Sequence, residues 1–175
     1  MMQHKIVIAN SGFANRGKST SIRYVFELLS SRYRTNINII EPKQGYNPNE
    51  DIKAIIGIPQ SDGHIVKVGI ESQGDPGSRQ IKSINDFVTA GCEIILVACR
   101  VKGTTKTEVL SLQRSDWQVI WFKNSIMKVD VANQSSTSTP PLRTQDARLQ
   151  ERLSRDYAFY VASLIERLVL TEGII

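Results

Sequence analysis

Two glycines, a lysine and a serine near the start of the chain have the types and spacing needed to hold a phosphate group. Residues 12–19 read GFANRGKS, in which Lys18 and Ser19 directly follow the second glycine. Glycine adopts backbone conformations that other residues avoid, so this loop can turn its N–H groups towards an anion. The lysine ammonium adds positive charge, and the serine hydroxyl is a ligand for a divalent cation. We therefore predict a polyphosphate site over residues 12–19.

A strand and a helix are expected on either side of this loop. Residues 5–9 read KIVIA, a short run of mostly β-branched apolar residues that indicates a buried strand. Residues 18–31 predict a helix, because apolar side chains recur at helical spacing at Ile22, Val25, Phe26 and Leu29. The N-terminus of such a helix carries about half a positive charge, which would also face the phosphates.

The loop with its two flanking elements, roughly residues 5–31, resembles the Walker A motif of the P-loop nucleoside triphosphate hydrolase superfamily. The resemblance implies ATP or another nucleoside triphosphate as ligand and Mg²⁺ as its metal. It implies that Lys18 reaches the β- and γ-phosphates, that Ser19 ligates Mg²⁺ and that Thr20 lies near the α-phosphate. The implied nucleotide-binding residues are Gly12, Phe13, Ala14, Asn15, Arg16, Gly17, Lys18, Ser19 and Thr20.

A carboxylate is also needed to hold the metal, normally at the end of a neighbouring strand. Glu71 ends the apolar run 65–71, and Asp75 follows in a Gly-Asp-Pro-Gly segment. Ligands of open α/β sheets bind beyond the carboxyl ends of the strands, so both acids are candidate metal ligands beside Ser19, with Asp75 preferred. The alternatives are that Asp75 only forms a turn before Pro76 and that Glu71 is a solvated strand end.

Arginines near the expected site are candidates for stabilising charge on a transferring phosphoryl group. Arg100 is the best of them because it ends the strand 93–99, and Lys18, Asp75 and Arg100 form the predicted catalytic set. Arg16 and Arg79 are weaker candidates, and each of the three arginines has the alternative of being a plain surface charge. Four further arginines near the last helix resemble the arginine-bearing lid of nucleotide monophosphate kinases. The equal alternative is that they form the solvated face of a helix. They are Arg143, Arg148, Arg152 and Arg155.

The rest of the chain alternates between predicted strands and helices. Strands are expected at 37–40, 52–58, 65–70, 93–99 and 117–122, and helices at 78–90, 105–114 and 146–170. The turn Ser61-Asp62-Gly63 predicts an antiparallel hairpin between the runs 52–58 and 65–70. This pattern favours an α/β fold, a three-layer P-loop sandwich whose mostly parallel sheet includes one antiparallel hairpin strand.

Three finer expectations concern the helices and the loop before the last one. Thr105 and Glu108 have capping-box spacing at the start of the helix 105–114. Residues 132–144 are rich in Ser, Thr and Pro and predict a flexible loop. The inner face of the final helix is expected to consist of Leu149, Leu153, Tyr157, Tyr160, Leu164 and Leu168.

Composition narrows the classes of protein further. The 175 residues suit one domain over 1–175, and no apolar run approaches the roughly 18–20 residues of a membrane span. The net charge of +5 lies in residues 1–36, which hold six basic residues and one acidic residue. A local excess suits a small phosphorylated ligand, so nucleic acid is not indicated. Cys92 and Cys99 are too far apart on one strand to form a disulfide, and with no signal-like start a cytoplasmic location is expected.

Three functions fit these observations. The first is Mg²⁺-dependent binding and hydrolysis of a purine nucleotide, with ATP favoured because no N-K-x-D segment and no standard D-x-x-G segment is present. The second is a kinase that transfers the γ-phosphate to a nucleotide or small-molecule acceptor. The third is a non-catalytic nucleotide-binding module that acts through a protein partner.

Overall fold

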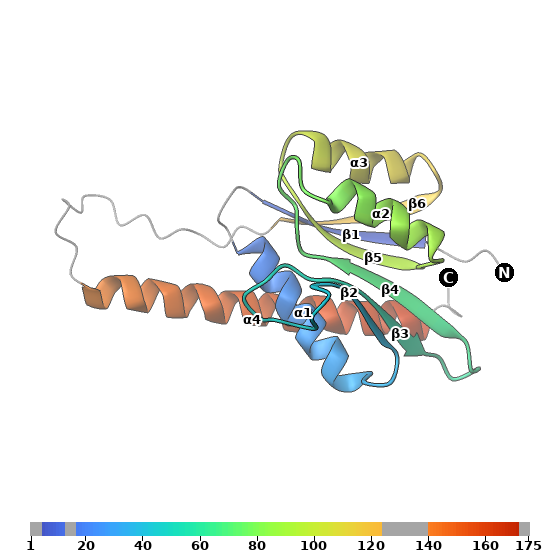
Figure 1. Ribbon diagram of the computed structural model, residues 1–175, viewed down its shortest axis with the longest axis horizontal. Coiled ribbons are helices and arrows are strands. Elements are labelled where there is room, and N and C mark those ends of the chain that lie inside the picture. The colour runs from blue at the N-terminus through green and yellow to red at the C-terminus, as the bar shows by residue number, and fades with distance from the viewer. Residues whose placement is uncertain (1–4, 13–16, 124–139, 172–175) are drawn as a thin grey trace.

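The computed structural model describes residues 5–12, 17–123 and 140–171, with no side chains described at 140–147 and 171. Phe13, Ala14, Asn15 and Arg16 of the expected phosphate loop lie outside these residues, as do residues 132–139 of the expected flexible loop. The described part of the chain forms one mixed sheet with helices on both of its faces (Figure 1).

The sheet has six strands in the described ranges, in the spatial order β2-β3-β4-β5-β1-β6. The strands are β1 (Lys5–Ser11), β2 (Ile37–Glu41), β3 (Lys53–Pro59), β4 (Ile65–Glu71), β5 (Ile94–Cys99) and β6 (Trp117–Lys123). Strands β4, β5, β1 and β6 are parallel, whereas β3 runs antiparallel to both of its neighbours, β2 and β4. The predicted α/β fold, with a mostly parallel sheet and one antiparallel strand, is confirmed.

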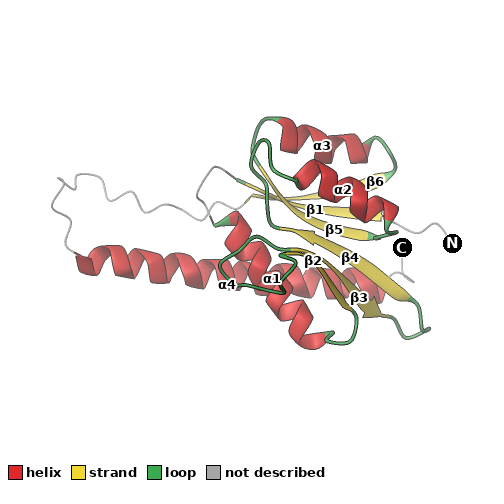
Figure 2. Cartoon of the chain, viewed as in Figure 1, coloured by secondary structure: helices red, strands yellow, loops and turns green. Residues whose placement is uncertain are grey.

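The described helices are α1 (Lys18–Arg32), α2 (Gln80–Thr89), α3 (Thr104–Gln113) and α4 (Pro140–Thr171). Helices α1 and α4 cover one face of the sheet, and α2 and α3 cover the other, as the colouring of Figure 2 makes plain. The alternation of side chains along β1 explains the two cores. Ile6 and Ile8 pack towards α1 and α4, while Val7 and Ala9 pack towards α2 and α3. None of these described helices has the length and apolar character needed to cross a bilayer.

The start of α3 differs from the prediction. Gly103, with a φ of 100°, is the residue before the first turn, and no side chain caps that turn. The hydroxyl of Thr105 instead accepts a hydrogen bond from the backbone N–H of Arg100 at 3.0 Å. The capping box was therefore wrong, because Thr105 ties the helix to the end of β5 rather than to its own backbone.

The last helix differs in both its start and its inner face. Helix α4 begins at Pro140, so residues 140–144 are helical and not part of a loop. The residues that face the core are Ser154, Ala158, Val161, Ala162, Ile165 and Val169. The predicted inner face was wrong at Leu149, Leu153 and Tyr160, which are exposed, while Tyr157, Leu164 and Leu168 are partly buried at its margin. Small residues on the true inner face let α4 lie close to α1 and the sheet.

Candidate functional site

The carboxyl ends of three parallel strands bring the predicted site residues to one edge of the sheet. Ser11 at the end of β1 lies beside Cys99 at the end of β5, and Glu71 at the end of β4 lies beside Val97. The N–H of Gly12 donates a hydrogen bond to the carbonyl of Cys99 at 3.2 Å, which fixes the point where the chain leaves β1. The segments that follow β1, β4 and β5 therefore begin next to one another.

The described side of the turn into α1 consists of a left-handed glycine followed directly by the first turn of the helix. Gly17 adopts the left-handed conformation, with φ 71° and ψ 14°, which favours glycine at this position. No side chain of the described residues caps the N-terminus of α1, and no acidic residue lies in its first turn. The first backbone N–H groups of a helix have no partner within the helix, so they point outwards as donors with the positive end of the helix dipole behind them.

Lys18 begins α1 and has only 6% of its surface exposed. Burial holds the pKa of its ammonium below the usual value of 10.5, and the positive charge of Arg100 lowers the pKa further. The carboxylate of Asp75 acts in the opposite direction and raises it. Each of the two side chains lies close enough to Lys18 to act on its charge, so the structure brings together all three predicted catalytic residues.

Asp75 and Arg100 form an ion pair at this edge of the sheet. Their carboxylate and guanidinium are 2.8 Å apart, and the Asp75 side chain is 69% exposed. A carboxylate with so much exposed surface can change partners at little cost, because water replaces any contact that it loses. The pair thus presents one anionic and one cationic group beside the buried ammonium of Lys18.

Ser19 and Thr20 have defined partners in the first turn of α1. The hydroxyl of Ser19 donates to the backbone carbonyl of Ser72, just after β4, at 2.9 Å. The hydroxyl of Thr20 accepts a hydrogen bond from Arg23 at 3.2 Å. The Ser19 contact places an oxygen ligand of the type that Mg²⁺ prefers directly against the loop that carries Asp75.

Glu71 has a different environment from the one expected of a metal ligand. It is fully buried, and both of its carboxylate oxygens accept hydrogen bonds from the protein. One oxygen receives the N–H of Gln73 at 2.9 Å, and the other receives Arg79 at 2.9 Å and the hydroxyl of Ser83 at 2.5 Å. With both oxygens engaged, Glu71 fixes the loop between β4 and α2, and Arg79 neutralises its charge.

The loop from Ser72 to Arg79 is held by contacts that the sequence did not reveal. The backbone of Gly74 lies so close to Ala98 that an added Cβ would approach its carbonyl carbon to 2.5 Å. The Ser72 hydroxyl donates to Asp51 at 2.7 Å and accepts the N–H of Ile52 at 2.9 Å. These contacts fix the backbone that leads into Asp75.

Three further residues near this edge of the sheet were not predicted. Asn10 is fully buried, and its amide group donates to the carbonyl of Lys18 at 3.4 Å. Burial raises the pKa of the Cys99 thiol above 9.0, whereas a hydrogen bond with Ser11 and the charges of Lys18 and Lys106 lower it. Lys106, from the first turn of α3, therefore adds a second lysine near the end of β5. Of these three residues, Asn10 is the one that the sequence could have indicated, because it lies at the end of a predicted strand.

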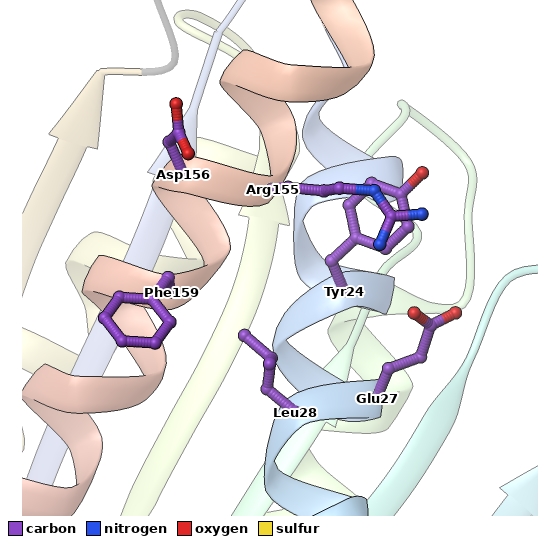
Figure 3. Close-up of a pocket in the computed structure, with 6 residues that line it drawn as sticks. All are labelled: Tyr24, Glu27, Leu28, Arg155, Asp156 and Phe159. Atoms are coloured by element: carbon purple, nitrogen blue, oxygen red, sulfur yellow. The ribbon is translucent and has the colours of Figure 1, made fainter.

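The arginines of α4 lie in a different setting. Arg155 stacks over the ring of Tyr24 at 4.4 Å and pairs with Glu151 at 3.1 Å. Figure 3 shows Arg155 and Tyr24 in a shallow groove between α1 and α4, with the other lining residues Glu27, Leu28, Asp156 and Phe159. Arg148 and Arg152 are exposed, and the side chain of Arg143 lies outside the described residues. These contacts fit the alternative of a solvated helix face.

The described part of the chain contains no group of three or more His, Cys, Asp or Glu side chains placed to hold a metal ion. Comparison with protein-family models, curated proteins and solved structures finds no match to this chain.

Proposed function

We propose that this protein is a small P-loop ATPase, which binds a purine nucleoside triphosphate with Mg²⁺ and hydrolyses it. The observation that carries the proposal is the buried Lys18, directly after the left-handed Gly17, at an N-terminus of α1 that no described side chain caps. A lysine buried at the cost of a lowered pKa, with donors beside it, is suited to a strongly anionic ligand. The GFANRGKS pattern and its place after a parallel strand support the same ligand.

Mg²⁺ fits the oxygen ligands at this edge. A hydroxyl and an exposed carboxylate, from Ser19 and Asp75, are hard donors of the kind that Mg²⁺ takes. This ion usually keeps several waters and shares the ligand's phosphates, so two protein ligands suffice. When bound, the ion would neutralise phosphate charge. Glu71 is proposed to hold the loop that presents Asp75 rather than to ligate the metal.

Phosphate binding and the stabilisation of developing charge are assigned to residues of the chain itself. The N–H groups of the first turn of α1 bind phosphate oxygens, and Lys18 pairs with the β- and γ-phosphates. Asp75, which pairs with Arg100, would be a ligand of the metal when the ion is bound, and Arg100 would then stabilise the charge that builds on the transferred phosphoryl group. Water is the acceptor in this proposal. ATP is favoured over GTP because the chain lacks the N-K-x-D segment.

The test is to measure phosphate release and ligand binding on the full chain. Wild type with Mg²⁺ and ATP, without any added acceptor, should release inorganic phosphate. At ATP one hundred-fold above the dissociation constant, binding should stabilise the fold by about 2.7 kcal/mol in a thermal-shift assay. Lys18→Ala should abolish both effects, while Lys82→Ala, which removes an exposed lysine of α2, should retain them.

The possible outcomes separate the candidate functions. Tight binding of ATP without turnover would contradict hydrolysis and favour the non-catalytic module. Turnover that needs an added acceptor would favour the kinase. An equal thermal shift in wild type and Lys18→Ala would contradict the assigned site itself.

A further inference from the structure

Helix α4 carries a second apolar stripe on its outward side, opposite the face that packs on the core. Leu149, Leu153, Tyr160 and Leu170 are 46%, 39%, 63% and 71% exposed. Together with three polar residues at intermediate positions, these four residues form a series along the helix with alternating steps of four and three residues. This is the spacing of a coiled-coil seam. We call this set the outer seam: Leu149, Leu153, Asp156, Tyr160, Ser163, Arg167 and Leu170.

Most of the outer seam lies outside the core, although the ring of Tyr160 meets the ring of Phe122 in β6, with the ring centroids 5.9 Å apart. The core side of α4 is complete without it, because Ala158, Val161 and Ile165 on the opposite face are fully buried. Figure 1 shows α4 on the outside of the molecule, with its N-terminal part extending beyond the sheet and the other helices. Large apolar side chains repeated along an exposed helix face indicate an interaction surface.

The seam is complementary to itself in one orientation. If two copies of α4 pair antiparallel about a midpoint between residues 161 and 162, Leu153 lies opposite Leu170. In the same register Asp156 lies opposite Arg167, and Tyr160 lies opposite Ser163. A parallel, in-register pair would instead bring Asp156 against Asp156 and Arg167 against Arg167, which is repulsive. The charges thus select a two-fold antiparallel arrangement, in which the same patch serves both copies.

We propose that α4 pairs through its outer seam with α4 of a second copy of this chain to form an antiparallel two-fold dimer. Phe159, which is 57% exposed beside the seam, adds apolar surface at its margin. The pairing uses the face of α4 directed away from the sheet. It is therefore independent of the proposed nucleotide site.

The test is the mass of the full chain in solution, measured by sedimentation velocity over a range of concentrations. Wild type should reach twice the chain mass of 19.6 kDa. Asp156→Arg should weaken dimerisation at least tenfold, because it places two arginines opposite each other. The double variant Asp156→Arg with Arg167→Asp should restore the dimer, since it exchanges the two charges across the seam.

A matched control lies on the same helix. Glu151→Arg makes the same charge change at an exposed position outside the seam and should leave the dimer intact. Circular dichroism of each variant confirms that α4 still folds. A wild type that stays monomeric at all concentrations would overturn the proposal. So would a dimer that tolerates both Asp156→Arg and Leu153→Glu, because the association would then use another surface.

Discussion

Removing the guanidinium of Arg79 should destabilise the fold by about 3 kcal/mol. Arg79→Ala leaves the carboxylate of Glu71, which has no exposed surface, with the Gln73 N–H and the Ser83 hydroxyl as its remaining donors in the described part of the chain. Breaking a buried ion pair by removing one partner costs about 3–5 kcal/mol, because the remaining charge stays buried and uncompensated. The Arg79 side chain is 27% exposed, so part of its charge is already hydrated and the lower end of that range applies.

Urea denaturation at pH 7 measures this loss, and a double-mutant cycle assigns it to the pair. In the Glu71→Gln background the buried group is neutral, so Arg79→Ala should cost only about 1 kcal/mol, the value of an ordinary hydrogen bond. The coupling is then about 2 kcal/mol. Arg114→Ala, which removes an exposed arginine after α3, should change stability by less than about 0.5 kcal/mol.

Equal losses from Arg79→Ala in both backgrounds would refute this reasoning, because the charge of Glu71 would then be irrelevant to the effect. A loss of less than about 1 kcal/mol in the free energy of unfolding when Arg79→Ala is made in wild type, with an unchanged slope against urea concentration, would also refute it.

Three other results are expected. Phosphate binding favours the ammonium form of Lys18. Nucleotide affinity, measured by titration calorimetry, should therefore be full at neutral pH and should fall as the pH rises through the lowered pKa of Lys18, starting below pH 10.5. An affinity that does not change with pH up to 10.5 would contradict this role of Lys18. Gly74→Ala should lower stability by about 1–3 kcal/mol in thermal unfolding, since the new Cβ meets the backbone of Ala98; an unchanged melting temperature would mean that the loop moves freely. Burial raises the pKa of the Cys92 thiol to about 12 and that of Cys99 above its usual value. Both thiols should therefore resist iodoacetamide at pH 8 and react after unfolding in urea, whereas fast native labelling would contradict their burial.

The elements that the sequence predicted best are those that depend on local signals. The apolar run of β1, the helical spacing over Ile22, Val25 and Phe26, and the turn before His64 each specify their own structure within a few residues. Gly91, with a φ of 74°, follows the C-cap residue Ala90 of α2, which is the position where glycine commonly ends a helix. Such patterns fixed the order of elements and the direction of β3.

The errors arose where a residue had two possible partners. Leu153 and Tyr160 continue a regular apolar spacing, but α4 has two apolar stripes, and the smaller residues Ala158 and Ala162 face the core. Spacing alone does not say which stripe packs inside. Thr105 likewise fits a helix cap, but its hydroxyl instead serves the N–H of Arg100.

The surroundings of the candidate site depended on contacts between distant elements. Glu71 could be placed at a strand end from the sequence, but its partners Arg79 and Ser83 lie eight and twelve residues further on, at the start of α2. The contact of Gly74 with Ala98 likewise joins two segments that only the folded sheet brings together. Lys18, Asp75 and Arg100 were predicted individually, and parallel strand order is what brings them together.

A crystal structure of the full chain grown with Mg²⁺ and a non-hydrolysable ATP analogue tests the central claim most directly. We expect density for the triphosphate at the N-terminus of α1, within hydrogen-bond distance of the Lys18 ammonium, with a metal ion near Ser19 and Asp75. A nucleotide bound elsewhere, with Lys18 still buried against the protein and the Asp75–Arg100 pair unchanged, would contradict it.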